Sequence, residues 1–254
     1  MRIEPSSGHP SAPVTPPAFE PSSLQSRLSG RFSHPPRRQL MLIGGGFVAL
    51  LACLLVLGAI AEDVHNQEAN ALDALANPLL HSLSSPILDA VMGTLTTLGS
   101  TIVVVPLFVA ALVLLIWRRH RREALFLAVS MAGSLVLNQS LKLIFQRPRP
   151  QLAWAQVQPE YSFPSGHAMN SIVFYVAVAL IVWALWGRRA GLIVTVLAVV
   201  LALLIGTSRI YLGYHYFTDV VGGLLAGAAW LIIVAAALDG RLWLSRWRGH
   251  ESGP

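Results

Sequence analysis

Six long uncharged apolar runs constrain the fold of this chain more than any other feature of its sequence. A helix needs about 20 apolar residues to cross a bilayer core, and most of these runs approach that length. Only 12% of the 254 residues are charged, whereas a soluble domain carries about 25%. We therefore expect an all-α polytopic membrane protein, a bundle of six transmembrane helices whose apolar runs are Leu40–Ala61, Thr101–Trp117, Ala124–Ser140, Ala168–Trp186, Ala190–Thr207 and Val220–Leu238.

The segments outside these runs divide the chain further. Residues 1–39 are rich in Pro and Ser and predict a disordered cytoplasmic tail, 40–240 form the six-span domain, and 241–254 form a short basic cytoplasmic tail. The first run starts too late and is too long for a signal peptide, so we expect it to be an anchor. Residues 69–99 predict one or two interfacial helices before the second span. A solvated acidic stretch on the outer side is expected from Glu62, Asp63, Glu68 and Asp73.

The arginines predict the orientation of the spans. Five arginines precede the first run, four follow the second, two follow the fourth and three follow the sixth. Cytoplasmic loops carry an excess of Lys and Arg, so these fourteen of the eighteen basic residues place both termini in the cytoplasm. The net charge of +6 is therefore mostly a topology signal, and we expect no nucleic-acid partner.

Four basic residues are left over, and all fall within three short motifs on the predicted outer side. Charges beside bilayer-length apolar helices are costly, so such residues are functional candidates. The left-over residues are Lys142, Arg147, Arg149 and Arg209. The motifs read Lys142-x6-Arg149-Pro150, then Pro164-Ser165-Gly166-His167, then Ser208-Arg209-x5-His215-x3-Asp219.

The motif residues suit phosphate binding. Lys142, Arg149 and Arg209 can surround the phosphoryl oxygens with positive charge, because Arg offers a planar fork and Lys a point charge. The backbone N–H groups of Ser165 and Gly166, near a helix N-terminus, can point at an anion.

The histidines add reactive groups to this anion site. His215 and Asp219 are four residues apart, which on a helix places them on one face. A carboxylate beside one ring nitrogen leaves the other free to attack phosphorus. His167 would then protonate the leaving oxygen and later activate water.

Two further residues are possible members of the site, and one pair predicts packing. Arg147 forms a second Arg-Pro pair beside Arg149, and it could equally be a loop cation that touches headgroups. If it belongs to the site, it would distinguish single phosphates from diphosphates. Ser208 precedes Arg209 in the third motif. Gly223 and Gly227 have the small-xxx-small spacing that favours close packing of the sixth span.

The three motifs together resemble the type 2 phosphatidic acid phosphatase superfamily of membrane lipid phosphatases. The resemblance covers roughly residues 40–240, and every fixed position of the family pattern is matched. It implies a six-helix bundle with an outward-facing site, a phosphohistidine intermediate on His215, orientation of that ring by Asp219, and His167 as acid and then base. Phosphate would be bound by Lys142, Arg149, Ser165, Gly166 and Arg209.

The predicted function is thus metal-independent hydrolysis of a lipid phosphate or diphosphate at the outer membrane face. Family members act on phosphatidic acid, phosphatidylglycerophosphate or polyprenyl diphosphates. We expect no cofactor and no metal, since no His, Cys or carboxylate cluster has metal-ligand spacing. An oligomer is not required, and a bacterial inner membrane with the site facing the periplasm fits the predicted topology. Two alternatives stay open: non-enzymatic transport or binding of an anionic lipid, and an oxidase that uses bound vanadate.

Overall fold

The computed structural model describes residues 37–66, 70–156 and 159–238. The tail predicted for residues 241–254 and nearly all of the tail predicted for 1–39 lie outside these ranges. The chain divides into two units at Met41 and Leu42. The second unit, from Leu42 onward, holds all the motif residues and is described here by itself.

Regular structure in the described residues is entirely helical, so the all-α expectation is confirmed. Two helices, α3 and α4, fill the region predicted to contain one or two interfacial helices. The helices are α2 (Arg37–His65), α3 (Ala71–His81), α4 (Pro86–Leu98), α5 (Thr101–Trp117), α6 (Arg121–Phe145), α7 (Gly166–Trp186), α8 (Arg188–Tyr211) and α9 (Phe217–Ala237).

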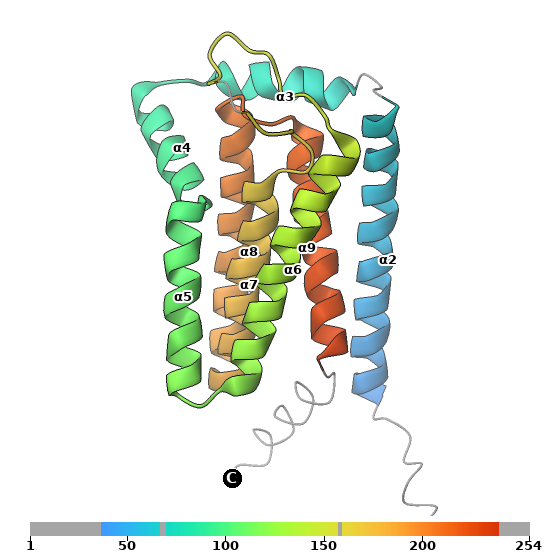
Figure 1. The fold of residues 1–254 in the computed structure, drawn as a ribbon, viewed down its shortest axis with the longest axis vertical. Coiled ribbons are helices and arrows are strands. Elements are labelled where there is room, and N and C mark those ends of the chain that lie inside the picture. The colour runs from blue at the N-terminus through green and yellow to red at the C-terminus, as the bar shows by residue number, and fades with distance from the viewer. Residues whose placement is uncertain (1–36, 67–69, 157–158, 239–254) are drawn as a thin grey trace, which may run out of the picture. The chain divides into compact units, whose positions relative to one another are not determined.

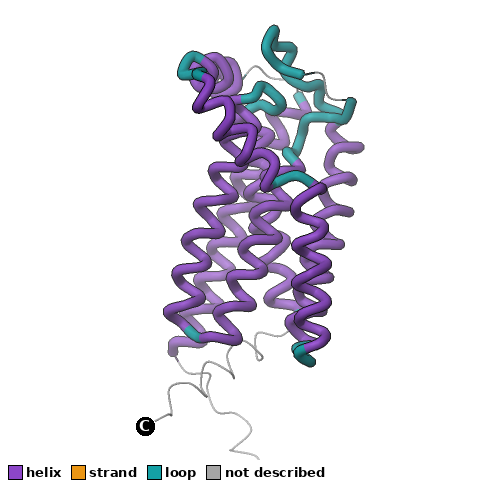
Figure 2. The backbone as a smooth tube through the Cα atoms, turned by 90° about the vertical axis from the view of Figure 1, so that its left-hand side faces the viewer, coloured by secondary structure: helices purple, strands orange, loops and turns teal. Residues whose placement is uncertain are grey.

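The helices α5 to α9 run side by side as a membrane-spanning bundle (Figures 1 and 2). Five described helices are long and apolar enough to span a bilayer, and a sixth span arises if α4 and α5, bent by 43° at their junction, count as one. The short helix α3 lies across one end of the bundle, where it packs on α8 and α9 (Figure 1). The six predicted spans therefore correspond to observed helices, and α3 covers the end where the motif residues lie.

A buried row of polar side chains follows one face of α6 toward this covered end. Ser130, Ser134, Asn138 and Lys142 recur every fourth residue, which places them on one helix face, and all are buried. Ser134 Oγ donates to Asn170 Oδ1 of α7 at 2.8 Å. Polar side chains that bond across helices fix one packing of α6 on α7, so this row sets where Lys142 stands.

The expected close packing of the last span is confirmed. A Cβ atom on Gly223 would lie 2.6 Å from the carbonyl oxygen of Ser165, and one on Gly227 would lie 2.9 Å from the carbonyl oxygen of Met169. Only glycine allows α9 to approach the backbone of α7 this closely. The approach brings the start of α7 beside the start of α9, and Ser165 N donates to the Asp219 carbonyl at 2.9 Å.

Candidate active site

The structure gathers the three motifs at one end of the bundle. Lys142 lies in the last turn of α6, His167 in the first turn of α7, Arg209 in the last turn of α8 and Asp219 in the first turn of α9. The chain reverses direction between successive helices, so these ends meet although the motifs are far apart in sequence (Figure 1). Arg149 and His215 join them from loops.

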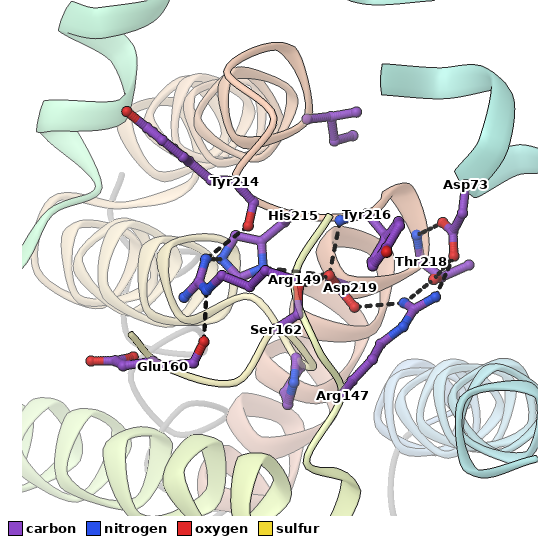
Figure 3. A network of polar contacts seen from close by, with 12 residues as sticks. Asp73, Arg147, Arg149, Glu160, Ser162, Tyr214, His215, Tyr216, Thr218 and Asp219 are labelled. Atoms are coloured by element: carbon purple, nitrogen blue, oxygen red, sulfur yellow. Dashed lines mark hydrogen bonds and ion pairs between the residues drawn. The ribbon is translucent and has the colours of Figure 1, made fainter. Parts of the chain in front are cut away.

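Arg149 contacts Glu160, Tyr214 and His215 at one side of the polar network (Figure 3). Its Nε donates to the carbonyl of Glu160 at 2.7 Å and its Nη1 to the carbonyl of Tyr214 at 2.8 Å. The same Nη1 lies 3.2 Å from His215 Nε2. Burial lowers the pKa of Arg149, yet a guanidinium stays protonated at physiological pH. A fixed positive charge thus stands beside the ring nitrogen of His215.

The other two predicted cations differ in how they are held. Lys142 Nζ forms a 2.6 Å ion pair with Glu160 Oε2, and the Glu160 side chain is 68% exposed. Arg209 Nη1 donates to Thr96 Oγ1 at 2.8 Å, and its guanidinium stacks over the Tyr214 ring at 4.3 Å. Arg209 Nε is buried and makes no hydrogen bond with any described residue. A buried donor of this kind is costly unless a ligand satisfies it.

The Ser165–Gly166 turn presents a different donor from the one predicted. The backbone N–H of Ser165 is used by the Asp219 carbonyl, so it does not point at an anion. The Ser165 hydroxyl is instead buried, and among the described residues it has no hydrogen-bond partner. Gly166 begins α7, where the first N–H groups have no intrahelical acceptor. The turn is held from behind by Asn138, whose Nδ2 donates to the Pro164 carbonyl at 3.3 Å.

The His215 ring is oriented by its neighbours. Arg149 can only donate hydrogen bonds, so Nε2 of His215 must be the accepting, unprotonated nitrogen. The proton therefore lies on Nδ1, which is 3.5 Å from Asp219 Oδ2 and 3.4 Å from Ser162 Oγ. Burial lowers the pKa of His215 to about 4, which agrees with a neutral ring at neutral pH. An unprotonated Nε2 is the form that can attack an electrophile.

The expectation that His215 and Asp219 share a helix face is wrong in its geometry. Helix α9 begins at Phe217, so His215 lies in the preceding loop and Asp219 in the first turn. The reason is local: Asp219 Oδ2 accepts from the backbone N–H of Tyr216 at 2.9 Å, which stops the helix from extending further back. The two side chains meet across this cap.

His167 lies beside the junction of α4 and α5. A Cβ atom on Gly99, the C-cap residue that follows α4, would lie 3.4 Å from His167 Cδ2 and 2.9 Å from Ser171 Oγ. The absence of a side chain at Gly99 leaves room for the imidazole. His167 thus lies close to the bend between α4 and α5.

The two residues named only as possible members of the site are engaged elsewhere. Ser208 Oγ donates to the Ile205 carbonyl of its own helix at 2.6 Å. Arg147 forms 2.7 Å ion pairs with both Asp73 and Asp219 (Figure 3). Burial opposes the charge of Arg147, but the two carboxylates outweigh it and raise its pKa. Arg147 therefore faces carboxylates on the far side of Asp219 from His215.

Asp73 corrects the prediction of a solvated acidic stretch. Its side chain is buried and accepts from Thr218 N at 2.8 Å and from Thr218 Oγ1 at 2.7 Å. Sequence reasoning also missed Ser162, whose hydroxyl donates to Asp219 Oδ2 at 2.5 Å. For Ser162 a signal existed, because it stands only two residues before the second motif. No comparable signal marks Asp73.

No group of three or more His, Cys, Asp or Glu side chains in the described part of the chain is arranged to hold a metal ion. Positive charge at the site comes from Lys142, Arg149 and Arg209. Together with an unprotonated histidine nitrogen, these cations are typical of one class: a helical membrane protein with a candidate anion site beside a histidine that can act as a nucleophile.

Comparison with known proteins agrees with this class. The family model of the PAP2 superfamily matches residues 123–243. Phosphatidylglycerophosphatase B of Bacillus subtilis is 30% identical over 189 residues, which cover 74% of this chain and 92% of that protein. An undecaprenyl-diphosphatase of Sulfolobus acidocaldarius is 30% identical over 161 residues, which cover 60% of this chain and 71% of that protein.

A solved structure agrees as well. The crystal structure of a transmembrane PAP2 type phosphatidylglycerolphosphate phosphatase from Bacillus subtilis superposes with a TM-score of 0.68 at 29% identity, covering 74% of this chain and 94% of that one. The chain belongs to the PAP2 superfamily. The expectations of an integral membrane protein and of a lipid phosphatase are thereby confirmed.

Proposed function

We propose that this protein hydrolyses a lipid phosphate monoester or diphosphate in two steps, without a metal, through a phosphohistidine on His215. The observation that carries the proposal is the 3.2 Å approach of His215 Nε2 to the guanidinium of Arg149. This approach requires an unprotonated Nε2, and it places that nitrogen beside a cation that attracts phosphate.

In the first step, the Nε2 lone pair attacks phosphorus and the bond from phosphorus to the lipid oxygen breaks. His167 donates its proton to the departing oxygen. Asp219 stabilises the positive charge that develops on the imidazole, and it keeps the remaining proton on Nδ1. Lys142, Arg149 and Arg209 neutralise the phosphoryl oxygens, which is the main electrostatic demand of phosphoryl transfer.

In the second step, water replaces the histidine. His167, now neutral, accepts a proton from the water as its oxygen attacks phosphorus. The phosphorus–nitrogen bond breaks, free phosphate leaves, and His215 regains its lone pair. With a diphosphate substrate the same steps apply, and the leaving group of the first step is the lipid monophosphate.

A groove beside His167 supports a lipid as the substrate. The groove has a volume of about 290 Å³. Apolar side chains of α5 and α6 form most of its walls, and it reaches Gly99 at the His167 end. An acyl or prenyl chain lying there would place its headgroup at the cations. Phosphatidic acid, phosphatidylglycerophosphate and polyprenyl diphosphates all have this form, and the names of the relatives include the latter two.

The position of the arginines supports a site on the periplasmic side of a bacterial inner membrane. Arg118 and Arg121 join α5 to α6, and Arg188 begins α8, all at the ends of these helices opposite to Lys142 and Arg209. Loops rich in arginine stay in the cytoplasm. The motif end would then face outward, with both termini cytoplasmic.

The test is phosphate release by purified protein in detergent micelles containing EDTA. Phosphatidic acid, phosphatidylglycerophosphate and a polyprenyl diphosphate are compared as substrates. We expect release from at least one, inhibition by vanadate, and a loss in kcat of about 10⁴-fold or more for His215→Ala, as for other covalent nucleophiles. Full activity of His215→Ala would overturn the proposed nucleophile, and activity only with added metal would overturn metal independence.

A further inference from the structure

We infer that Asp73 of α3 and Arg147 are positioning residues for Asp219 and His215, so that α3 is part of the catalytic unit. The inference rests on the proposed role of His215 as nucleophile. It concerns a helix that precedes the residues matched by the family model, which begin at residue 123.

The first step of the argument is the way Asp219 divides its two oxygens. Oδ1 accepts from Arg147 Nη1 at 2.7 Å. Oδ2 accepts from Ser162 and from Tyr216 N, and it faces the Nδ1–H of His215. Because Arg147 holds Oδ1, the carboxylate cannot rotate without breaking a buried ion pair. Oδ2 is thereby kept in the direction of the His215 ring.

The second step is the anchoring of Arg147 itself. Its Nη2 donates to Asp73 Oδ2 at 2.7 Å, and its Nη1 also donates to Thr218 Oγ1 at 2.8 Å. The guanidinium lies over the ring of Tyr216, 4.2 Å from the ring centroid. These contacts hold the planar fork from three sides, as Figure 3 shows. A lysine could not reproduce them, because it is a point charge that lacks the fork.

The third step is that Asp73 also fixes the start of α9. Its Oδ1 accepts the backbone N–H of Thr218, one of the first-turn donors of α9 that has no partner within the helix. A carboxylate near a helix N-terminus is also favoured by the helix dipole. Asp73 thus caps, from 145 residues away in sequence, the helix turn that carries Asp219.

A second residue of α3 extends the same support to His215. Asn77 lies one helical turn after Asp73 and is buried. Its Nδ2 donates to the His215 carbonyl at 3.1 Å and to the Ile210 carbonyl at 2.8 Å. One face of α3 therefore holds both the backbone of His215 and, through Arg147, the carboxylate that orients its ring.

The test separates positioning from simple stabilisation by measuring the rate constant of enzyme phosphorylation. Rapid-quench single-turnover reactions with a radiolabelled lipid phosphate give both a rate constant and an amplitude. A variant that merely folds less well loses amplitude, whereas a misplaced nucleophile lowers the rate constant in the molecules that are folded. Asp73→Asn removes the charge but keeps the shape, and Arg147→Met removes the charge but keeps most of the apolar stem.

We expect the phosphorylation rate constant to fall roughly 10-fold in Asp73→Asn and roughly 100-fold in Arg147→Met, with KM changed less than about 3-fold, as for other residues that orient a reacting group. The double variant should be no slower than Arg147→Met, because both substitutions break one chain of contacts. Arg147→Lys, which can still pair with one carboxylate, should recover part of the rate and serves as a milder variant if Arg147→Met does not fold.

Tyr211→Phe is the matched control. It removes another hydrogen bond between helices, from the Tyr211 hydroxyl of α8 to Asp89 of α4, and this bond is partly buried and does not involve Asp219. We expect its rate constant to match the unsubstituted protein. The inference is overturned if the Asp73 and Arg147 variants lose only amplitude, or if their effects on the rate constant multiply. If His215→Ala still becomes phosphorylated, the proposed nucleophile is wrong and the inference falls with it.

Discussion

The two halves of the site are built in different ways. The nucleophile half holds the proposed nucleophile and consists of Ser162, His215 and Asp219, and its polar atoms are hydrogen bonded to other protein groups. The Asp219 carboxylate, for example, accepts hydrogen bonds from Arg147, Ser162 and the backbone N–H of Tyr216. The phosphate half consists of the residues proposed to bind phosphate: Lys142, Arg149, Ser165, Gly166 and Arg209. It contains buried polar atoms that no described residue satisfies, on Ser165 and Arg209.

This difference suggests that the two halves contribute to different steps of the reaction. A nucleophile gains from being held in one geometry, because misplacement by about 1 Å can cost 100-fold in rate. An anion site gains from donors that are buried yet unused, because a phosphate that pairs with them removes an existing cost. The nucleophile half should therefore govern kcat, and the phosphate half should govern the binding of phosphate and of the transition state.

The largest expected effects come from substituting one residue in each half. Asp219→Asn keeps the shape but removes the charge that holds the His215 proton on Nδ1, so we expect kcat to fall by about 10³- to 10⁴-fold with little change in KM. Arg209→Met removes a proposed donor to the phosphoryl oxygens, so we expect kcat/KM to fall by about 10²- to 10³-fold and inhibition by vanadate to weaken in proportion. Steady-state kinetics and vanadate titration of both variants check this.

The proposed difference between the two halves is wrong if Asp219→Asn and Arg209→Met change the kinetic constants and vanadate inhibition in the same way. An Asp219→Asn protein that loses vanadate affinity as strongly as Arg209→Met would show that the carboxylate also organises the anion site. Thr207→Val, which removes a hydroxyl that bonds only to the Leu203 carbonyl of its own helix, is the matched control near Arg209.

Much of the fold could be predicted because bilayer thickness imposes a length on apolar runs. The run Thr101–Trp117 coincides with α5. The run Ala124–Ser140 became the longer helix Arg121–Phe145, because a helix can continue past the charged residues that end an apolar run. Lys142 therefore lies on the helix and not in the loop that follows it.

The motif residues could be predicted to gather, since the distribution of the arginines predicts that all of them lie on one membrane side. Their partners could not be predicted in the same way. Asp73 contacts Arg147 and Thr218, which are more than seventy residues away in the sequence. Other acidic residues precede Asp73 in the sequence, so the sequence predicts that Asp73 is exposed to solvent, as they are expected to be. Its burial follows from the way α3 lies across α8 and α9, which depends on tertiary packing that no local pattern reveals.

A smaller effect tests whether the two halves depend on one contact between α7 and α9. A Cβ atom on Gly223 would lie 2.6 Å from the Ser165 carbonyl, a backbone atom that cannot rotate away. We expect Gly223→Ala to destabilise the protein by about 1–3 kcal/mol, as overpacking does. Because the Ser165 turn must shift, kcat/KM should fall as well, by roughly 10-fold.

Thermal unfolding in detergent and steady-state kinetics check the Gly223 prediction. Gly58→Ala in α2 is the matched control, since nothing lies within 4 Å of the added Cβ atom there. It should leave both measurements unchanged or slightly raise the stability. Equal effects of the two substitutions would mean that the close approach of α9 to α7 does not support the phosphate half.

The smallest expected effect concerns Glu160, the exposed carboxylate that pairs with Lys142 at 2.6 Å. A substrate phosphate must compete with this carboxylate for Lys142, so Glu160→Gln should lower KM. Exposed ion pairs contribute only about 0.2–1 kcal/mol, which corresponds to a decrease in KM of about 1.5- to 5-fold. Glu62→Gln, which removes another exposed carboxylate, is the control and should leave KM unchanged.

The effect of Glu160→Gln should also depend on pH in one direction. The hydrogen bond from Lys142 lowers the pKa of Glu160, so the carboxylate stays charged and paired at neutral pH and at mildly acidic pH. The ion pair is lost only as the pH falls through that lowered pKa, after which the variant and the unsubstituted protein hold Lys142 alike. The ratio of their KM values should therefore differ from one near pH 7 and approach one at low pH. A ratio of one at every pH would show that Glu160 does not compete with phosphate. Lys142 would then, like His215, need no rearrangement of its contacts before it meets the substrate.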